Sequence, residues 1–370
     1  MFDLEPTEEQ QLMVQTAREL AKNEMDPKAH DADEAAALPA DFLKRSWELG
    51  LACAAIPEQY NGAAMERSAV TGALILEELG AGDLAMALAM LAPAGVAYPV
   101  LDHGTEAQKE RYLRACTGNE FPQLTAAVME PDYDFDPTEL RTIAKRQGAG
   151  YVLSGKKCLV PNGAAAETYL VYARLDGAAE GFEGVAAFFV PKASTGLSVS
   201  DKEKNMGVHA LDSVTLTLDN VAVSVDARLG GEGPINFERI MSYARVALSA
   251  LACGVARRAY EHSVEYAKER KTWGQAIATR QSVAFTIADM RMELDAARLL
   301  VWEAAWRLDR GETATKESYL AKMIVDEMVL EVTDEAVMIM GGHGYIRENP
   351  VERWLRNARG FAAFEGLALV

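Results

Sequence analysis

Glu365 has the sequence setting that most favours acid–base chemistry. It lies in the segment GFAAFEGLALV, residues 360–370, where its neighbours are small or apolar. Apolar surroundings disfavour the charged form of a carboxylate, and this makes the group a better base near neutral pH. An ordinary acid without a catalytic role fits the same segment, so the immediate neighbours leave both interpretations open.

Other catalytic patterns are absent from the sequence, which contains no P-loop and no Gly-x-Ser-x-Gly turn. The histidines never fall at metal-ligand spacing, so we predict no metal site. They are His30, His103, His209, His262 and His343. The tetrapeptide GGHG, residues 341–344, comes closest to a glycine-rich phosphate loop. It follows an expected helix instead of a strand, so the residues alone predict a turn between helices.

The charge of the chain limits its partners. The 370 residues include 37 Lys and Arg against 55 Asp and Glu, a formal charge of −18. Surfaces that bind nucleic acid are basic, so we exclude nucleic acid as the main partner. Four scattered cysteines without a CxxC pair indicate reduced, mostly buried thiols and a cytoplasmic location. They are Cys53, Cys116, Cys158 and Cys253.

No membrane association is expected. The N-terminal segment is acidic and lacks the basic-then-apolar pattern of a signal peptide. The longest uncharged run, residues 84–101, contains Pro93, Gly95 and Pro99. These residues favour a buried helix with a turn over a membrane span.

The elements that must position Glu365 fall into three zones, which we interpret as a multidomain α+β fold. Residues 1–122 predict an N-terminal helical domain, with helices over residues 8–23, 41–51 and 68–79. Thr7 and Gln10 have the spacing of a capping box at the first of these helices. Residues 123–234 predict a small antiparallel β domain. Its strand-like runs are residues 168–173, 185–190 and 214–218.

The third zone, residues 235–370, returns to helical periodicity. The apolar residues of one stripe step by three or four positions, and we interpret the stripe as the core of a helical bundle. They are Val283, Ile287, Met290, Leu294, Ala297 and Val301. Met323, Ile324 and Met328 predict a second core stripe.

Several motifs together resemble the acyl-CoA dehydrogenase family in their order and spacing. They extend over nearly the whole chain. In chain order they are PEQYNG (57–62), GTEAQKERYL (104–113), KNMGV (204–208), ERKTWG (269–274) with Gln281, MGGHGYIR (340–347), NPVER (349–353), RNAR (356–359) and FEG (364–366).

The resemblance implies a fold and a reaction. The fold has an N-terminal helical domain, a middle antiparallel β-barrel or sandwich and a C-terminal four-helix bundle. Family members remove two hydrogens from an acyl-CoA thioester, in fatty acid or aromatic acid metabolism. The glutamate of the FEG motif, here Glu365, takes the α-proton, and FAD accepts the β-hydride. The thioester oxygen is held by the backbone N–H of that glutamate and by a hydroxyl of the FAD ribityl chain.

The resemblance also implies site residues and partners. Arg245 and Phe364 match residues near the substrate. The residues that match cofactor contacts are Arg270, Thr272, Trp273, Gln281, Gly341, Gly342 and Gly366. Family members form dimers or tetramers with FAD at a subunit interface, and their usual electron acceptor is electron-transferring flavoprotein.

The sequence departs from the family where a chain touches its own flavin. Residues without a hydroxyl or amide stand at the positions of the usual contacts: Met129, Phe135, Leu159, Pro161, Met338 and Leu367. Asp132, Asp134 and Asp136 add negative charge where a pyrophosphate is expected. The contacts lent to a neighbouring subunit are better kept, as in Arg270 and Trp273. The short helix that family members form after the Glu-Gly pair is expected to be missing or to come from another subunit.

Three interpretations follow from these departures. The chain is an acyl-CoA dehydrogenase that binds FAD through its backbone in a homo-oligomer, or it is one subunit of a heteromer whose other chain holds FAD. The third interpretation is a flavin-free acyl-CoA enzyme, in which Glu365 serves hydratase, isomerase or lyase chemistry, or a non-catalytic partner subunit.

Overall fold

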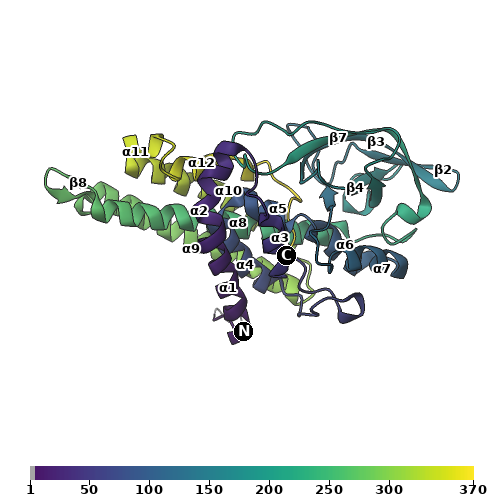
Figure 1. The fold of residues 1–370 in the computed structure, drawn as a ribbon, viewed down its shortest axis with the longest axis horizontal. Coiled ribbons are helices and arrows are strands. Elements are labelled where there is room, and N and C mark those ends of the chain that lie inside the picture. The colour runs from purple at the N-terminus through teal and green to yellow at the C-terminus, as the bar shows by residue number, and fades with distance from the viewer. Residues whose placement is uncertain (1–4) are drawn as a thin grey trace.

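The computed structural model describes residues 5–370 and has the expected order of helices, strands and helices (Figure 1). The N-terminal helices are α1 (Glu8–Leu20), α2 (Asp26–Ala35), α3 (Phe42–Glu48), α4 (Ala69–Gly82), α5 (Leu84–Leu91), α6 (Ala94–His103) and α7 (Glu106–Ala115). A π-helical turn, Ala21–Met25, joins α1 to α2. The predicted capping box is confirmed, because Thr7 Oγ1 accepts from the Gln10 N–H and the Gln10 side chain accepts from the Thr7 N–H.

The middle zone is one curled sheet. Its strands are β1 (Leu124–Ala127), β2 (Ile143–Gln147), β3 (Gly150–Pro161), β4 (Thr168–Leu175), β5 (Val185–Pro191), β6 (Leu197–Val199) and β7 (Ser213–Ser224). The strand order is β1-β4-β2-β3-β7-β6, and β5 pairs with β4. Most pairs are antiparallel, but β4 runs parallel to β1 and to β2. Periodicity along single strands did not predict these parallel pairs, because it carries no information about strand order.

The last zone is a bundle of long helices. They are α8 (Phe237–Glu269), α9 (Gln281–Asp309), α10 (Thr315–Met340), the short α11 (Gly342–Tyr345) and α12 (Val351–Phe361). A hairpin of β8 (Lys271–Thr272) and β9 (Gln275–Ala276) joins α8 to α9. In Figure 1 this hairpin lies at the tip of the α8–α9 pair, at the opposite end of the molecule from the middle sheet. We propose domain boundaries after residues 122 and 234, between these groups of elements.

The two helical zones share one hydrophobic core. α4 packs directly on α8, and glycines permit the close approach. A Cβ on Gly80 would lie 2.2 Å from the Leu251 carbonyl oxygen, and one on Gly254 would lie 2.1 Å from that of Glu77. A second core fills the inner face of the sheet. The N-terminal helices and the bundle therefore pack as one unit that supports the site.

The predicted core stripes are confirmed in part. Met290, Leu294, Ala297 and Val301 of α9 are buried, and so is Met328 of α10. Val283 and Ile287, the first two residues of the α9 stripe, are only half-buried. Met323 and Ile324 are exposed, at 44% and 42%, so the prediction that they belong to the core is wrong. They lie on the outer face of α10, where no element among residues 5–370 covers them.

Two helical stretches, Leu84–His103 and Phe237–Glu269, are long and apolar enough to resemble membrane spans. In each, 94% of the most apolar window is buried inside the protein. They are core helices of this fold, in line with the prediction for residues 84–101. The four cysteines are free thiols, three of them buried and Cys158 half-buried.

Candidate functional site

The loop after α12 carries Glu365 and is held by tight packing. The Phe364 N–H donates to the Gly360 carbonyl oxygen at 3.0 Å, which closes a turn at the end of the helix. The buried Phe364 ring covers Gly360, where a Cβ would lie 2.3 Å from the ring. Gly366 has φ +69°, and a Cβ there would lie 2.8 Å from Val128. Both glycines are therefore required by the shape of this loop.

The Glu365 carboxylate meets a buried cation. Arg245 of α8 is 5% exposed, and its Nε lies 3.4 Å from Glu365 Oε1. The Tyr319 ring of α10 lies 5.2 Å from the Arg245 guanidinium carbon. The other carboxylate oxygen, Oε2, is buried and has no hydrogen-bond partner among the described residues. The apolar sequence neighbours of Glu365 are therefore only part of its surroundings, because the fold brings Arg245 to it from another helix.

The backbone of Glu365 contacts the middle sheet. Its N–H lies 3.4 Å from the sulfur of Met129, which follows β1 by two residues. A thioether is a weak acceptor, so a stronger acceptor such as a thioester oxygen can replace it at little cost. The structure thus leaves this N–H available to a substrate.

A buried ion pair fixes the segment that faces Glu365. Lys157 of β3 is 0% exposed, and its Nζ donates to the Val128 carbonyl oxygen and to Glu130 Oε1, both at 2.8 Å. The Glu130 carboxylate also accepts from the backbone N–H groups of Arg141 and Thr142. Burial favours the neutral acid of Glu130, but Lys157 and these donors outweigh it and hold the pKa of Glu130 below its usual range.

The remaining cofactor-matched residues form a second group, distant from Glu365. Arg270, Thr272 and Trp273 lie in the β8–β9 hairpin, and Gln281 begins α9. Trp273 is 96% exposed, and the Arg270 side chain has no ion pair among residues 5–370. Gly341 and Gly342 lie where α10 meets α11, near the end of α8. The nearby contact between Tyr266 and His343 is 2.9 Å long. Only Gly366 of the cofactor-matched set lies beside Glu365.

The two groups fit FAD unequally. The exposed aromatic ring and the free guanidinium of the hairpin fit a base and a phosphate. In the middle sheet, the backbone N–H of Leu159 is already bonded to the Glu203 carboxylate at 3.1 Å. Met129 is 6% exposed and offers only its sulfur. At these two positions, the chain's own β domain offers a flavin no side-chain hydroxyl.

The acidic segment after Met129 is partly neutralised. Arg141 contacts Asp132 at 2.6 Å and Asp134 at 3.6 Å. Asp136 accepts from the N–H and the hydroxyl of Thr138. The excess of negative charge expected here is thus smaller than the sequence predicts, although one arginine does not neutralise three carboxylates.

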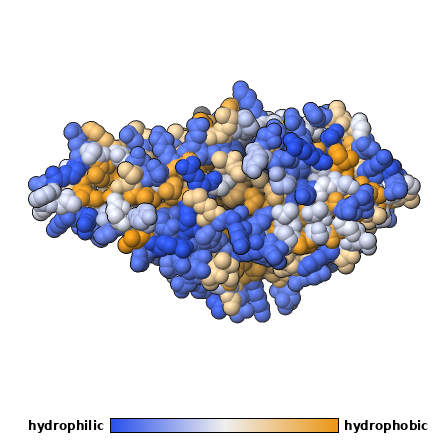
Figure 2. Space-filling view, turned by 90° about the horizontal axis from the view of Figure 1, so that it is seen from above, coloured by the Kyte–Doolittle hydropathy of each residue, from blue (hydrophilic) through white to orange (hydrophobic). Residues whose placement is uncertain are grey.

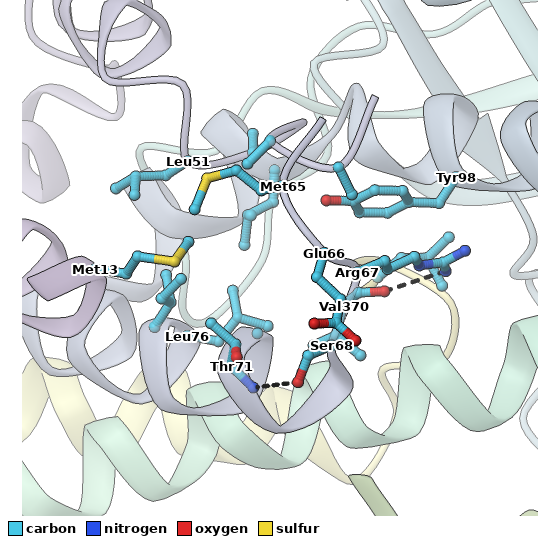
Figure 3. A pocket seen from close by; sticks show the side chains of 17 residues that line it. Met13, Leu51, Met65, Glu66, Arg67, Ser68, Thr71, Leu76, Tyr98 and Val370 are labelled. Carbon is cyan, nitrogen blue, oxygen red and sulfur yellow. Dashed lines mark hydrogen bonds between the residues drawn. The ribbon is translucent and has the colours of Figure 1, made fainter. Parts of the chain in front are cut away.

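Beyond Glu365 the chain enters a small cavity of about 60 Å³, bordered by α4, α6 and the segment before α4 (Figure 3). Leu369 and Val370 line it. Arg67 Nη2 donates to the backbone oxygen of Val370 at 3.2 Å. Its guanidinium carbon lies 4.4 Å from the ring centroids of both Tyr98 and Tyr243. These contacts hold the segment after Glu365 between the N-terminal helices and α8.

Sequence reasoning missed the middle-sheet residues that support the segment facing Glu365. Lys157 and Glu130 stand in stretches whose composition is ordinary for strands and loops, and the sequence marks Met129 only as a missing flavin contact. A lysine at an inward-facing strand position was the one available signal, because an unpaired ammonium is not buried.

Comparison with known proteins agrees with the fold. The chain matches the N-terminal, middle and C-terminal domains of acyl-CoA dehydrogenase over residues 7–120, 125–221 and 231–368. A cyclohex-1-ene-1-carbonyl-CoA dehydrogenase of Geobacter metallireducens is 35% identical over 95% of this chain and 93% of its own.

Solved structures are similar over the same length. Butyryl-CoA dehydrogenase from Megasphaera elsdenii has a TM-score of 0.88 at 30% identity, covering 98% of this chain and 96% of its own. An FAD complex of PigA has a TM-score of 0.89 at 27% identity, covering 98% and 95%. The family implies FAD as the cofactor and does not favour a flavin-free enzyme. From the three matched domains and these relatives, the chain belongs to the acyl-CoA dehydrogenase family of oxidoreductases.

Proposed function

We propose that this chain abstracts the α-proton of an acyl-CoA thioester with Glu365 during α,β-dehydrogenation. The observation that carries the proposal is the buried Oε2 atom of Glu365, which has no partner among residues 5–370 while Oε1 faces Arg245. A general base needs such an oxygen, free to approach the acidic C–H bond. The place of Glu365 in the FEG motif supports the same role.

Arg245 contacts the Oε1 atom of this base and leaves Oε2 for the substrate. A guanidinium remains protonated throughout the physiological range, and burial strengthens its attraction for the carboxylate. When Oε2 takes the proton, the carboxylate becomes neutral and the ion pair weakens. Loss of the α-proton places negative charge on the thioester oxygen of the substrate. The step therefore also needs a hydrogen-bond donor at that oxygen. We assign this role to the Glu365 N–H, which exchanges the Met129 sulfur for that oxygen.

FAD, when bound, supplies the acceptor for the β-hydride. On this chain, the hairpin residues Arg270, Thr272 and Trp273, with Gln281, Gly341 and Gly342, fit the cofactor of a neighbouring subunit better than Met129 and Leu159 fit the chain's own. We therefore propose that the chain works in an oligomer and that a second type of chain supplies most of the contacts to the FAD that would lie beside Glu365. The proposed electron acceptor is electron-transferring flavoprotein, and the proposed location is the cytoplasm.

The surface of α9 supports an oligomer. Phe285, Met292 and Leu299 are spaced by seven residues, and their side chains are 59%, 62% and 46% exposed. Figure 2 shows apolar side chains among charged ones over the half of the molecule that carries the long helices. An apolar row of this length on one helix face is typical of a protein interface.

Replacing Glu365 with Gln tests the proposed base. The amide has the same shape but does not take up the proton, so we expect turnover to fall by about 10²- to 10⁴-fold. Acyl-CoA binding, measured by calorimetry, should change little. Glu348→Gln is the matched control, because Glu348 is an exposed acid in the loop before α12. Full turnover in Glu365→Gln would contradict the assignment.

The visible spectrum of the purified chain tests the proposed heteromer. We expect a protein with little flavin absorbance that gains flavin when a second, FAD-holding family member is added. A chain that is yellow when purified alone, and whose colour bleaches with acyl-CoA, would contradict the heteromer and support a homo-oligomeric dehydrogenase.

A further inference from the structure

Two buried residues of opposite charge stand one turn apart on α10, close to the loop of Glu365. Lys322 Nζ lies 2.6 Å from Asp326 Oδ2, and the two side chains are 6% and 16% exposed. A charged pair this well buried carries a large desolvation cost, so its other contacts must be favourable. Nothing in the sequence pattern of α10 marks these two residues.

Lys322 also binds the end of the helix that carries the catalytic loop. Its Nζ donates to the carbonyl oxygen of Phe361 at 2.6 Å. Phe361 is the last residue of α12, and carbonyls at the C-terminus of a helix lack intrahelical partners and attract cations. The Phe361 ring packs edge-on against Phe364, with centroids 5.9 Å apart. Lys322 thus fixes the backbone four residues before Glu365.

Asp326 has a free oxygen and a charged neighbourhood. Its Oδ1 is buried without a hydrogen-bond partner among the described residues. Lys322 and Glu327 face it from α10, and Glu365 faces it from the loop. Burial, together with Glu365 and against the attraction of Lys322, raises the pKa of Asp326 to about 6. The pair on α10 and the base are therefore parts of one electrostatic cluster.

From these contacts we infer that Lys322 and Asp326 are positioning residues for Glu365. Asp326 orients the Lys322 ammonium, and Lys322 holds the Phe361 carbonyl, so that the loop presents the carboxylate of Glu365 in one place. The inference rests on the proposed role of Glu365 as the base. Neither residue of the pair needs to touch the substrate.

The test is the exchange of the α-hydrogens of butyryl-CoA with D2O, followed by mass spectrometry of the thioester. Removing Lys322 alone would leave an unpaired buried carboxylate, so Lys322 and Asp326 are replaced together by Leu. A displacement of about 1 Å at a catalytic group costs about 10²-fold in rate. We expect exchange to fall about 10- to 100-fold while the dissociation constant for butyryl-CoA changes less than twofold.

Two further variants keep the outcome decisive. Lys316→Met removes an exposed lysine of the same helix and should exchange at the wild-type rate. Lys322→Arg keeps the charge and is expected to fold, but its larger head group displaces the Phe361 carbonyl and should lower kcat more than it raises KM. Wild-type exchange in both the double variant and Lys322→Arg would overturn the positioning role. No exchange in the wild-type protein would instead overturn the proposed base together with this inference.

Discussion

Replacing Lys157 with Met tests whether the buried pair behind Met129 supports the site. Methionine fills a similar volume but leaves the Glu130 carboxylate buried with only two backbone donors. Breaking one partner of a buried ion pair costs about 3–5 kcal/mol. With a slope of about 3 kcal/mol per M, this corresponds to a fall of about 1–2 M in the urea midpoint. Lys156→Met is the control, because Lys156 is exposed on the other face of β3.

A second substitution separates the loss of charge balance from the loss of packing. Glu130→Gln in the Lys157→Met background removes the unpaired charge, keeps an oxygen for the two backbone N–H groups and offers an amide to the Val128 carbonyl. We expect the double variant to regain at least half of the lost unfolding free energy. If Lys157→Met unfolds within about 1 kcal/mol of Lys156→Met, a difference typical of surface substitutions, the reasoning is refuted.

Three further outcomes are expected. The folded protein holds the proton of Asp326 up to about pH 6, whereas the unfolded chain releases it at about pH 4. The unfolding free energy of the wild-type protein should therefore fall by about 3 kcal/mol relative to Asp326→Asn as the pH rises from roughly 4 to 6, measured by urea unfolding. Equal pH dependence of the two proteins would contradict this. Met129→Thr combined with Pro161→Thr adds two hydroxyls at flavin-contact positions of the β domain and should raise FAD affinity about 10-fold or more, measured by flavin absorbance after dialysis. An unchanged flavin content would argue against a flavin site at these two positions. Trp273→Ala should leave the melting temperature of the isolated chain unchanged, since the ring is 96% exposed, but should lower the flavin content of the assembled oligomer. Unaltered flavin content in the oligomer would contradict a contact between Trp273 and the FAD of a neighbouring subunit.

Periodicity and turn residues predict much of the fold. The helix starting after Thr7, the core stripe of α9 from Met290 onward and the strand-like runs of the middle zone all depend on local side-chain periodicity, and all appear in the structure. The outward position of Met323 and Ile324 was not predictable in this way. An apolar helix face has the same sequence pattern whether it packs inside its own chain or lies exposed on the surface of that chain.

The motif around Glu365 makes this residue predictable from the sequence, but it does not predict the contacts between elements that surround the residue. Glu365 stands in the FEG motif, but the pairing of its carboxylate with Arg245 joins residues 120 positions apart. The contacts of Lys322 with Phe361 and of Lys157 with Val128 also depend on how separate elements pack. Such long-range pairs leave no periodic signal of their own. The inward-facing strand position of Lys157 indicates burial but not its partners, and Lys322 alone resembles an ordinary surface residue.

The exchange of acyl-CoA α-hydrogens with D2O in the wild-type protein and in Glu365→Gln tests the central claim most directly. It reports proton abstraction itself and does not depend on an electron acceptor. We predict measurable exchange in the wild-type protein and a loss of about 10²-fold or more in Glu365→Gln, with acyl-CoA binding retained. Equal exchange in the two proteins would show that Glu365 is not the base.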